Sequence, residues 1–280
     1  MASSAHNRTA PPSLPIAARR QAWSWLPLAA APLLLFLLLP ILALVLRLRL
    51  PLLTTSLAQS AVRQAILLSL SSAATSMLLT LILGTPVAYL LARRRFRGRA
   101  LLETVIDLPM VLPPAVAGIA LLMAFGRRGL LGPLLLQLGI TLPFTPVAVV
   151  LAQLFVAAPF YIKAAMSGFG GVDRDYEQAA ALDGASRWGI FRHITLPLAW
   201  PTLFGGAIMT WARALGEFGA TIIFAGNFPG RTQTMPLAIY LGFELDINVA
   251  LTLAVILLVL SFGVLLVVKG LLRQPVRIMR

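Results

Sequence analysis

The chain has 280 residues, of which 59% are apolar and 11% are charged, and its formal net charge is +14. Soluble domains usually have about 25% charged residues, so this composition excludes an ordinary soluble protein and indicates an all-α integral membrane protein. The absence of cysteine excludes disulfides, thiolate metal sites and cysteine nucleophiles.

Apolar runs in chain order predict six transmembrane helices. They cover residues 25–46, 64–92, 105–126, 145–168, 200–226 and 247–271. The first run has no charged side chain. At about 1.5 Å per residue it reaches roughly 33 Å, enough to cross a hydrocarbon core of about 30 Å. We interpret it as a retained span, because it is too long for the apolar region of a signal peptide and no cleavage site follows it.

The positions of lysine and arginine orient the chain. Sixteen of these side chains fall on the side of the N-terminus, five of them within 93–99, and six fall on the other side. Positive charge gathers on the cytoplasmic side of membrane proteins, so both termini are predicted to be cytoplasmic, with short tails at 1–24 and 273–280. This bias accounts for the net charge, and no nucleic-acid partner is expected.

The cytoplasmic segment between the fourth and fifth predicted spans is half-polar. From Glu177 to Pro201 it reads EQAAALDGASRWGIFRHITLPLAWP. Its alanines favour a helix and Gly184 interrupts that helix. Trp188 and the neighbouring arginines would also suit an amphipathic loop that lies on the lipid headgroups, so the pattern by itself leaves both interpretations open.

The spacing within this segment resembles the EAA motif of ABC importer permeases. The residues that carry the match are Gln178, Ala179, Ala180, Gly184, Ile194, Leu196 and Pro197. Gln178 stands where the family prefers glutamate, and Glu177 directly precedes it. The resemblance implies the type I importer permease fold over residues 64–272, with residues 25–63 as an additional first helix and outer loop. It also implies that residues 176–198 form two short helices that dock on a separate ATPase subunit, with a turn back into the membrane at Leu196 and Pro197.

The chain has no recognisable nucleotide site of its own. Its only lysines, Lys163 and Lys269, are followed by alanine and glycine, so no GK[ST] phosphate loop is present. His6 and His193 stand alone, which excludes a paired-histidine metal site. We therefore expect a non-catalytic subunit that binds no metal or cofactor, with ATP used by the partner subunit.

The fifth predicted span contains two charged side chains. Arg213 and Glu217 lie four residues apart on one helical face, and Thr221 continues that face. Charged groups at this depth cost about 2.5–3.5 kcal/mol each. Such a pair either locks helices together or lines the substrate path, and both interpretations stay open. The three residues are the candidates for the path or its gate.

The same span and the following loop, residues 229–240, resemble molybdate permeases most closely. Sulfate permeases usually have tyrosine at the position of Phe218, and tungstate permeases are further relatives. The resemblance implies a homodimer of this chain in the bacterial inner membrane, two ATPase subunits, and a periplasmic or lipoprotein receptor that delivers an oxyanion. Molybdate is the expected anion, with sulfate or tungstate as the alternatives. A secondary carrier that needs no ATPase is the remaining alternative class.

Overall fold

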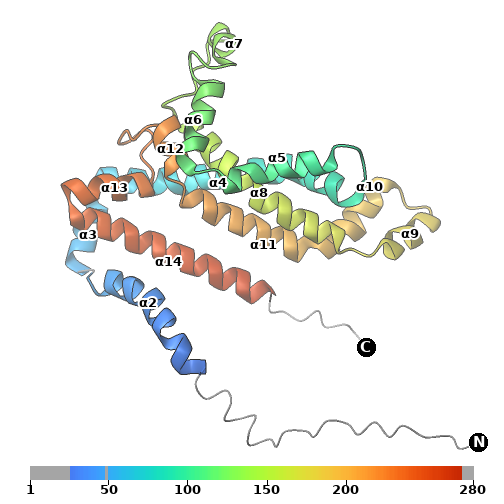
Figure 1. Ribbon diagram of the computed structural model, residues 1–280, viewed down its shortest axis with the longest axis horizontal. Coiled ribbons are helices and arrows are strands. Elements are labelled where there is room, and N and C mark those ends of the chain that lie inside the picture. Colours follow the sequence, from blue (N-terminus) through green and yellow to red (C-terminus); the bar gives the residue numbers. More distant parts are fainter. Residues whose placement is uncertain (1–25, 48–49, 273–280) are drawn as a thin grey trace, which may run out of the picture. The chain divides into compact units, whose positions relative to one another are not determined.

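The computed structural model describes residues 26–47 and 50–272, and within these stretches all regular structure is helical (Figure 1). The predicted tails at 1–24 and 273–280 lie outside the described residues. The chain divides into two compact units, Met1–Arg47 and Leu48–Arg280.

The first unit contains one helix of membrane-spanning length, α2 (Leu26–Leu46). Its span from Ala29 to Leu46 carries no charged side chain, and its leucines are largely exposed along that length. Apolar side chains on all sides of a helix are typical of a segment whose solvent is lipid.

The second unit contains the remaining helices. In chain order these are α3 (Leu50–Ala58), α4 (Ser60–Arg93), α5 (Arg99–Val111), α6 (Pro114–Phe125), α7 (Gly132–Gln137), α8 (Pro146–Gly170), α9 (Arg174–Leu182), α10 (Arg187–Ile190), the π-helical turn η1 (Phe191–Thr195), α11 (Leu196–Leu215), α12 (Gly219–Phe224), α13 (Met235–Leu245) and α14 (Ile247–Leu272).

Helices α4, α8 and α11 pack against one another and form the centre of this unit. Small residues allow the close approach: a Cβ atom added to Gly206 of α11 would lie 2.5 Å from that of Ala164 in α8. A hydrogen bond of 2.6 Å joins the hydroxyl groups of Thr85 in α4 and Tyr161 in α8. Helix α14 packs against α13, α11 and α3 within the same unit.

The membrane spans are helical, as predicted, but two of the six predicted spans are interrupted in the structure. Within the described residues, α2, α4, α8 and α14 are long and apolar enough to cross a bilayer. Helices α5 and α6 are bent by 117° relative to each other, and they make a fifth span only if the bent pair counts as one. Pro113 marks the end of α5, because it lacks an amide to continue the helical hydrogen bonds and the residue before it, Leu112, is extended.

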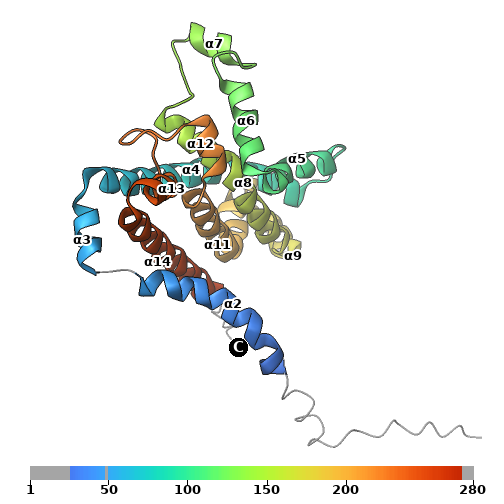
Figure 2. The same ribbon diagram turned by 60° about the vertical axis from the view of Figure 1, so that its left-hand side comes forward.

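The fifth predicted span, 200–226, is not one helix. Helix α11 ends at Leu215 and the short α12 begins at Gly219. This second break meets the α5–α6 bend: a Cβ atom on Gly219 would lie 2.6 Å from that of Pro114, and one on Gly118 would lie 2.9 Å from the carbonyl oxygen of Ala220. Helices α6 and α12 accordingly lie side by side (Figure 2).

Candidate functional site

Helix α9 opens the segment that matched the EAA spacing. Its N-cap is Asp173, whose side chain accepts a hydrogen bond of 3.1 Å from the amide of Asp175. Asp175 and Glu177 place negative charge in the first turn, where it interacts favourably with the helix dipole. A capped, acidic start therefore fixes where this helix begins.

The helix ends in a glycine turn of the Schellman type. The amide of Ala185 donates to the carbonyl of Ala180 at 2.9 Å, and the amide of Gly184 donates to that of Ala181 at 3.1 Å. Gly184 has φ +85°, which side-chain-bearing residues rarely adopt, and an added Cβ would meet no atom within 4 Å. The glycine is thus required by the backbone conformation and not by crowding within the chain.

The return into the membrane differs from the prediction. The expected turn at Leu196 and Pro197 is wrong, because helix continues from α10 through η1 into α11. The π-helical hydrogen bond from the amide of Leu196 to the carbonyl of Phe191 bridges the junction. Pro197 lacks an amide within this continuous helix, and the π-helical turn that directly precedes α11 accommodates the missing bond. The chain reverses at Gly184, after which the side chain of Ser186 caps α10 by accepting from the amide of Gly189 at 3.2 Å.

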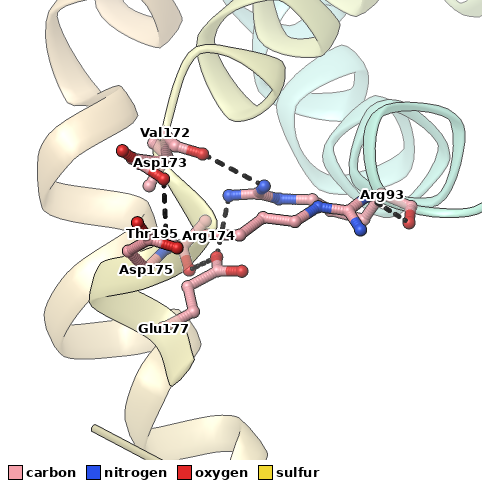
Figure 3. Close-up of polar contacts among 7 residues, drawn as sticks. All are labelled: Arg93, Val172, Asp173, Arg174, Asp175, Glu177 and Thr195. Carbon is pink, nitrogen blue, oxygen red and sulfur yellow. Dashed lines mark hydrogen bonds and ion pairs between the residues drawn. The ribbon is translucent and has the colours of Figure 1, made fainter. Parts of the chain in front are cut away.

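Glu177 joins three elements at this end of the molecule (Figure 3). Its Oε1 accepts a charge-assisted hydrogen bond of 2.8 Å from Arg93 Nη2, at the end of α4, and one of 2.6 Å from Thr195 Oγ1, in η1. Thr195 is fully buried, while the side chains of Arg93 and Glu177 are 10% and 20% exposed. The carboxylate therefore ties α4, α9 and η1 together in a mostly dry setting.

Further contacts of arginine strengthen this cluster. Arg93 Nη1 donates to the carbonyl of Val172 at 3.1 Å, and Arg174 Nη2 reaches the carbonyl of Arg93 at 3.5 Å. From the sequence, Arg93 contributed only to the predicted orientation of the chain, and no role was predicted for Thr195. The one available signal was a threonine between two apolar residues of the motif.

Most of the motif faces away from the helix bundle. Gln178, Ala179, Gly184 and Pro197 are exposed, and Ala180, Ile194 and Leu196 are half-buried. Two large apolar side chains of the same segment, Tyr176 and Leu182, are 61% and 89% exposed. Both side chains are therefore accessible to a partner.

Arg213 and Glu217 form an ion pair of 2.7 Å between Nη1 and Oε2. The side chain of Arg213 is 31% exposed and that of Glu217 only 1%. Glu217 lies in the break between α11 and α12, where its Oε1 accepts a hydrogen bond of 2.9 Å from the amide of Ala220. Its carboxylate thus neutralises the arginine and caps the short helix at once.

The continuous face predicted through Thr221 is not present, because the helix is interrupted between Leu215 and Gly219. Thr221 lies in α12, fully buried, and its Oγ1 has no hydrogen-bond partner among the described residues. In α8, the nitrogen and the oxygen of the Gln153 side-chain amide are likewise buried without a hydrogen-bond partner among the described residues. Other described residues, among them Ser76, Thr210 and Thr252, also have buried side-chain oxygens without a partner.

Comparison with known proteins decides the family. Residues 81–270 match the model of the binding-protein-dependent transport system inner membrane component. The chain belongs to this family. It is therefore a multi-pass inner-membrane permease component, and the resemblance seen in the EAA spacing is confirmed. The orientation of its termini stays a prediction.

Individual relatives extend over most of the chain. The molybdenum transport system permease protein ModB of Mycobacterium tuberculosis is 41% identical over 254 residues, covering 91% of this chain and 95% of its own. The ModB protein of Escherichia coli is 46% identical over 178 residues, covering 63% of this chain and 78% of its own.

Solved structures show the same fold at low sequence identity. A bacterial alginate ABC transporter, in complex with an alginate pentasaccharide-bound periplasmic protein, superposes with a TM-score of 0.72 at 18% identity, covering 92% of this chain and 96% of its own. The methionine ABC transporter MetNI in an inward-facing conformation gives 0.59 at 18% identity, covering 76% and 94%. These matches confirm an all-helical importer permease fold.

Proposed function

We propose that this chain is the membrane-spanning subunit of an ATP-driven molybdate importer. The observation that carries the proposal is the 41% identity to a molybdenum transport permease across 91% of the chain. Sulfate and tungstate remain alternative cargoes that the same oxyanion chemistry allows. A secondary carrier has no support, because the family is that of binding-protein-dependent systems.

The energy comes from a separate ATPase subunit, since the chain lacks a phosphate loop of the GK[ST] type. The segment from Arg174 to Pro197 docks on that subunit through its exposed turn at Gly184 and the apolar side chains of Tyr176 and Leu182. The cluster around Glu177 carries movement of the docked segment into α4 and η1, because its hydrogen bonds join these elements.

The full transporter contains two copies of this chain, two ATPase subunits and a receptor that delivers the oxyanion. ATP binding closes the ATPase pair, draws the two docked segments together and opens the path away from the cytoplasm. The receptor supplies the selectivity, so the permease need not hold the anion tightly. Arg213, whose side chain is 31% exposed, lies on the path, where charges within a membrane bundle are usually placed for transport. The buried Glu217 holds it there through their ion pair, and the fully buried Thr221 does not line the path.

Uptake of radiolabelled molybdate tests the proposal. Deleting this chain in its host should abolish uptake at low external molybdate, and the intact chain supplied in trans should restore it. A large excess of sulfate should leave the restored uptake unchanged. Loss of labelled sulfate uptake, with molybdate uptake intact, would instead identify a sulfate permease. Uptake of both anions unchanged by the deletion would remove the oxyanion assignment.

A further inference from the structure

A groove runs along the outside of α4 toward the segment that follows Gly184. Its volume is about 830 Å³. The lining residues on α4 and directly after it are Leu81, Ile82, Thr85, Pro86, Tyr89, Arg93 and Arg94, and those facing them include Glu177, Arg187, Trp188 and Phe191. One end of the groove is thus basic and aromatic, and the other is apolar.

The basic end carries uncompensated positive charge. Among the described residues, Glu177 is the only acidic one that lines the groove, and it is already paired with Arg93. Arg94 and Arg187 form no ion pair with any other described residue, and both are exposed. Two cationic side chains therefore face the groove without an acidic partner in the described part of the chain.

Aromatic rings form the wall beside these arginines. Trp188 stacks on Phe191 with ring centroids 5.5 Å apart, and Phe191 packs edge-on against Tyr89 at 5.1 Å. Trp188 is 66% exposed. Tryptophan and tyrosine are enriched where membrane helices meet the lipid headgroups, so this end of the groove has the composition of the interface.

The length of the groove fits one leaflet of a bilayer. From Arg94 to Leu81 the helical rise is about 20 Å, similar to half of a bilayer about 40–45 Å thick with its headgroups. A second cavity of about 660 Å³ lies beside the groove, because the two share Leu81, Thr85 and Phe191. That cavity is lined mainly by apolar side chains of α4, α8 and α11.

We infer that this groove binds an anionic phospholipid, with the headgroup phosphate between Arg94 and Arg187 and an acyl chain along Ile82 and Pro86. Charge at one end and apolar surface at the other match the two parts of such a lipid, and basic pockets beside membrane helices bind anionic headgroups. The site depends on membrane insertion, which the family establishes, and not on which oxyanion is carried.

Native mass spectrometry of the purified transporter tests this site. The intact assembly is titrated with phosphatidylglycerol or phosphatidylcholine that have identical acyl chains. The wild-type assembly should retain one phosphatidylglycerol per copy of this chain at concentrations where phosphatidylcholine does not bind. The Arg94→Gln, Arg187→Gln double variant should weaken that retention about tenfold or more, because each arginine near a headgroup contributes measurably to anionic lipid binding.

A matched control removes the same charge elsewhere. The Arg127→Gln, Arg128→Gln variant alters two exposed arginines after α6 that do not line the groove, and it should bind lipid as the wild type does. Equal retention of both lipids by the wild type would overturn the inference without the need for a variant. Unchanged phosphatidylglycerol binding after Arg94 and Arg187 are replaced, or a second protein chain crosslinked into the groove, would overturn it as well.

Discussion

The two ion pairs on which the proposed function depends have nearly the same geometry in different surroundings. The donor and acceptor are 2.8 Å apart in Arg93–Glu177 and 2.7 Å apart in Arg213–Glu217. The first pair joins residues 84 positions apart, and its carboxylate side chain is 20% exposed. The second joins residues four positions apart, and its carboxylate is 1% exposed.

This difference separates two kinds of dependence. A buried carboxylate that loses its cation is left as an uncompensated charge, which is costly for folding. A partly hydrated carboxylate can turn to water, so loss of its partner mainly changes how the joined segments are held. The Arg213–Glu217 pair should thus act chiefly on stability, and the Arg93–Glu177 pair on coupling.

The Arg93–Glu177 pair can act on coupling only if it lies on the cytoplasmic side, and labelling with thiol reagents tests this location directly. The chain has no native cysteine, so the single variants Arg95→Cys and Arg128→Cys each provide one reactive group. Arg128→Cys should react with an impermeant maleimide in intact cells, and Arg95→Cys only after permeabilisation. The reverse pattern of labelling would invert the predicted topology and the site with it.

Replacing Arg213 should have the largest effect on stability. Arg213→Met leaves Glu217 as a buried, unpaired anion and should lower the free energy of unfolding by about 3 kcal/mol. Glu217→Gln should cost less, because Arg213 is 31% exposed and the amide oxygen can still accept from Ala220. The unfolding midpoint and folded yield in detergent measure both. The double variant should regain much of the yield, whereas strictly additive losses would show that the side chains do not interact.

Transport by that double variant sharpens the result. If Arg213 also guides the dianion, molybdate uptake should remain poor although the protein is folded. Full uptake would restrict the pair to a structural role.

Substitution of Gly184 should impair coupling more than stability. At φ +85° a β-branched side chain is strained by about 1–2 kcal/mol, whereas asparagine adopts this region more readily. Gly184→Val should insert normally, co-purify poorly with the ATPase and lose most uptake, and Gly184→Asn should retain more of both. Equal losses would point to a clash with the ATPase surface. Normal uptake and a full ATPase complex in both variants would remove the coupling assignment.

Local patterns in the sequence predicted a large part of this structure. The apolar runs predicted an all-helical protein, and the spacing around Gly184 predicted the turn in which this glycine adopts a positive φ. The pairing of Arg213 with Glu217 was also accessible, because residues four apart share a helical face. Each of these features depends on neighbours within a few positions.

Features that depend on packing between distant segments could not be predicted from the sequence. The prolines at 109, 113 and 114 do not give the size of the 117° bend between α5 and α6, and they do not show that α6 packs against α12. The break after Leu215 has no proline, and it is stabilised by the Glu217 cap on Ala220. The contact between Arg93 and Glu177 crosses 84 positions, and no periodicity in one chain encodes such a distance.

Substitutions in the Arg93–Glu177 cluster should change coupling more than stability. Arg93→Met removes two charge-assisted hydrogen bonds, to Glu177 and to the carbonyl of Val172, and Glu177→Gln removes the charge from the bonds with Arg93 and Thr195. Each such bond is worth about 1.5–3 kcal/mol when dry and less here, because both side chains retain some exposure. The ATPase should still associate and hydrolyse ATP, but molybdate transported per ATP should fall several-fold. Reconstituted vesicles, with both rates measured together, provide this ratio.

A second ion pair at the same end of the molecule is the matched control. Arg99 and Glu103 lie 2.7 Å apart at i,i+4 spacing on α5, and their side chains are 37% and 34% exposed. Exposed pairs of this kind contribute about 0.3–0.5 kcal/mol, so Arg99→Gln with Glu103→Gln should leave the transport ratio unchanged. A fall equal to that of Arg93→Met would attribute the effect to loss of any ion pair at this end of the molecule. An unchanged ratio in every variant would show that the hydrogen bonds of Glu177 hold the segment in place without coupling it to α4.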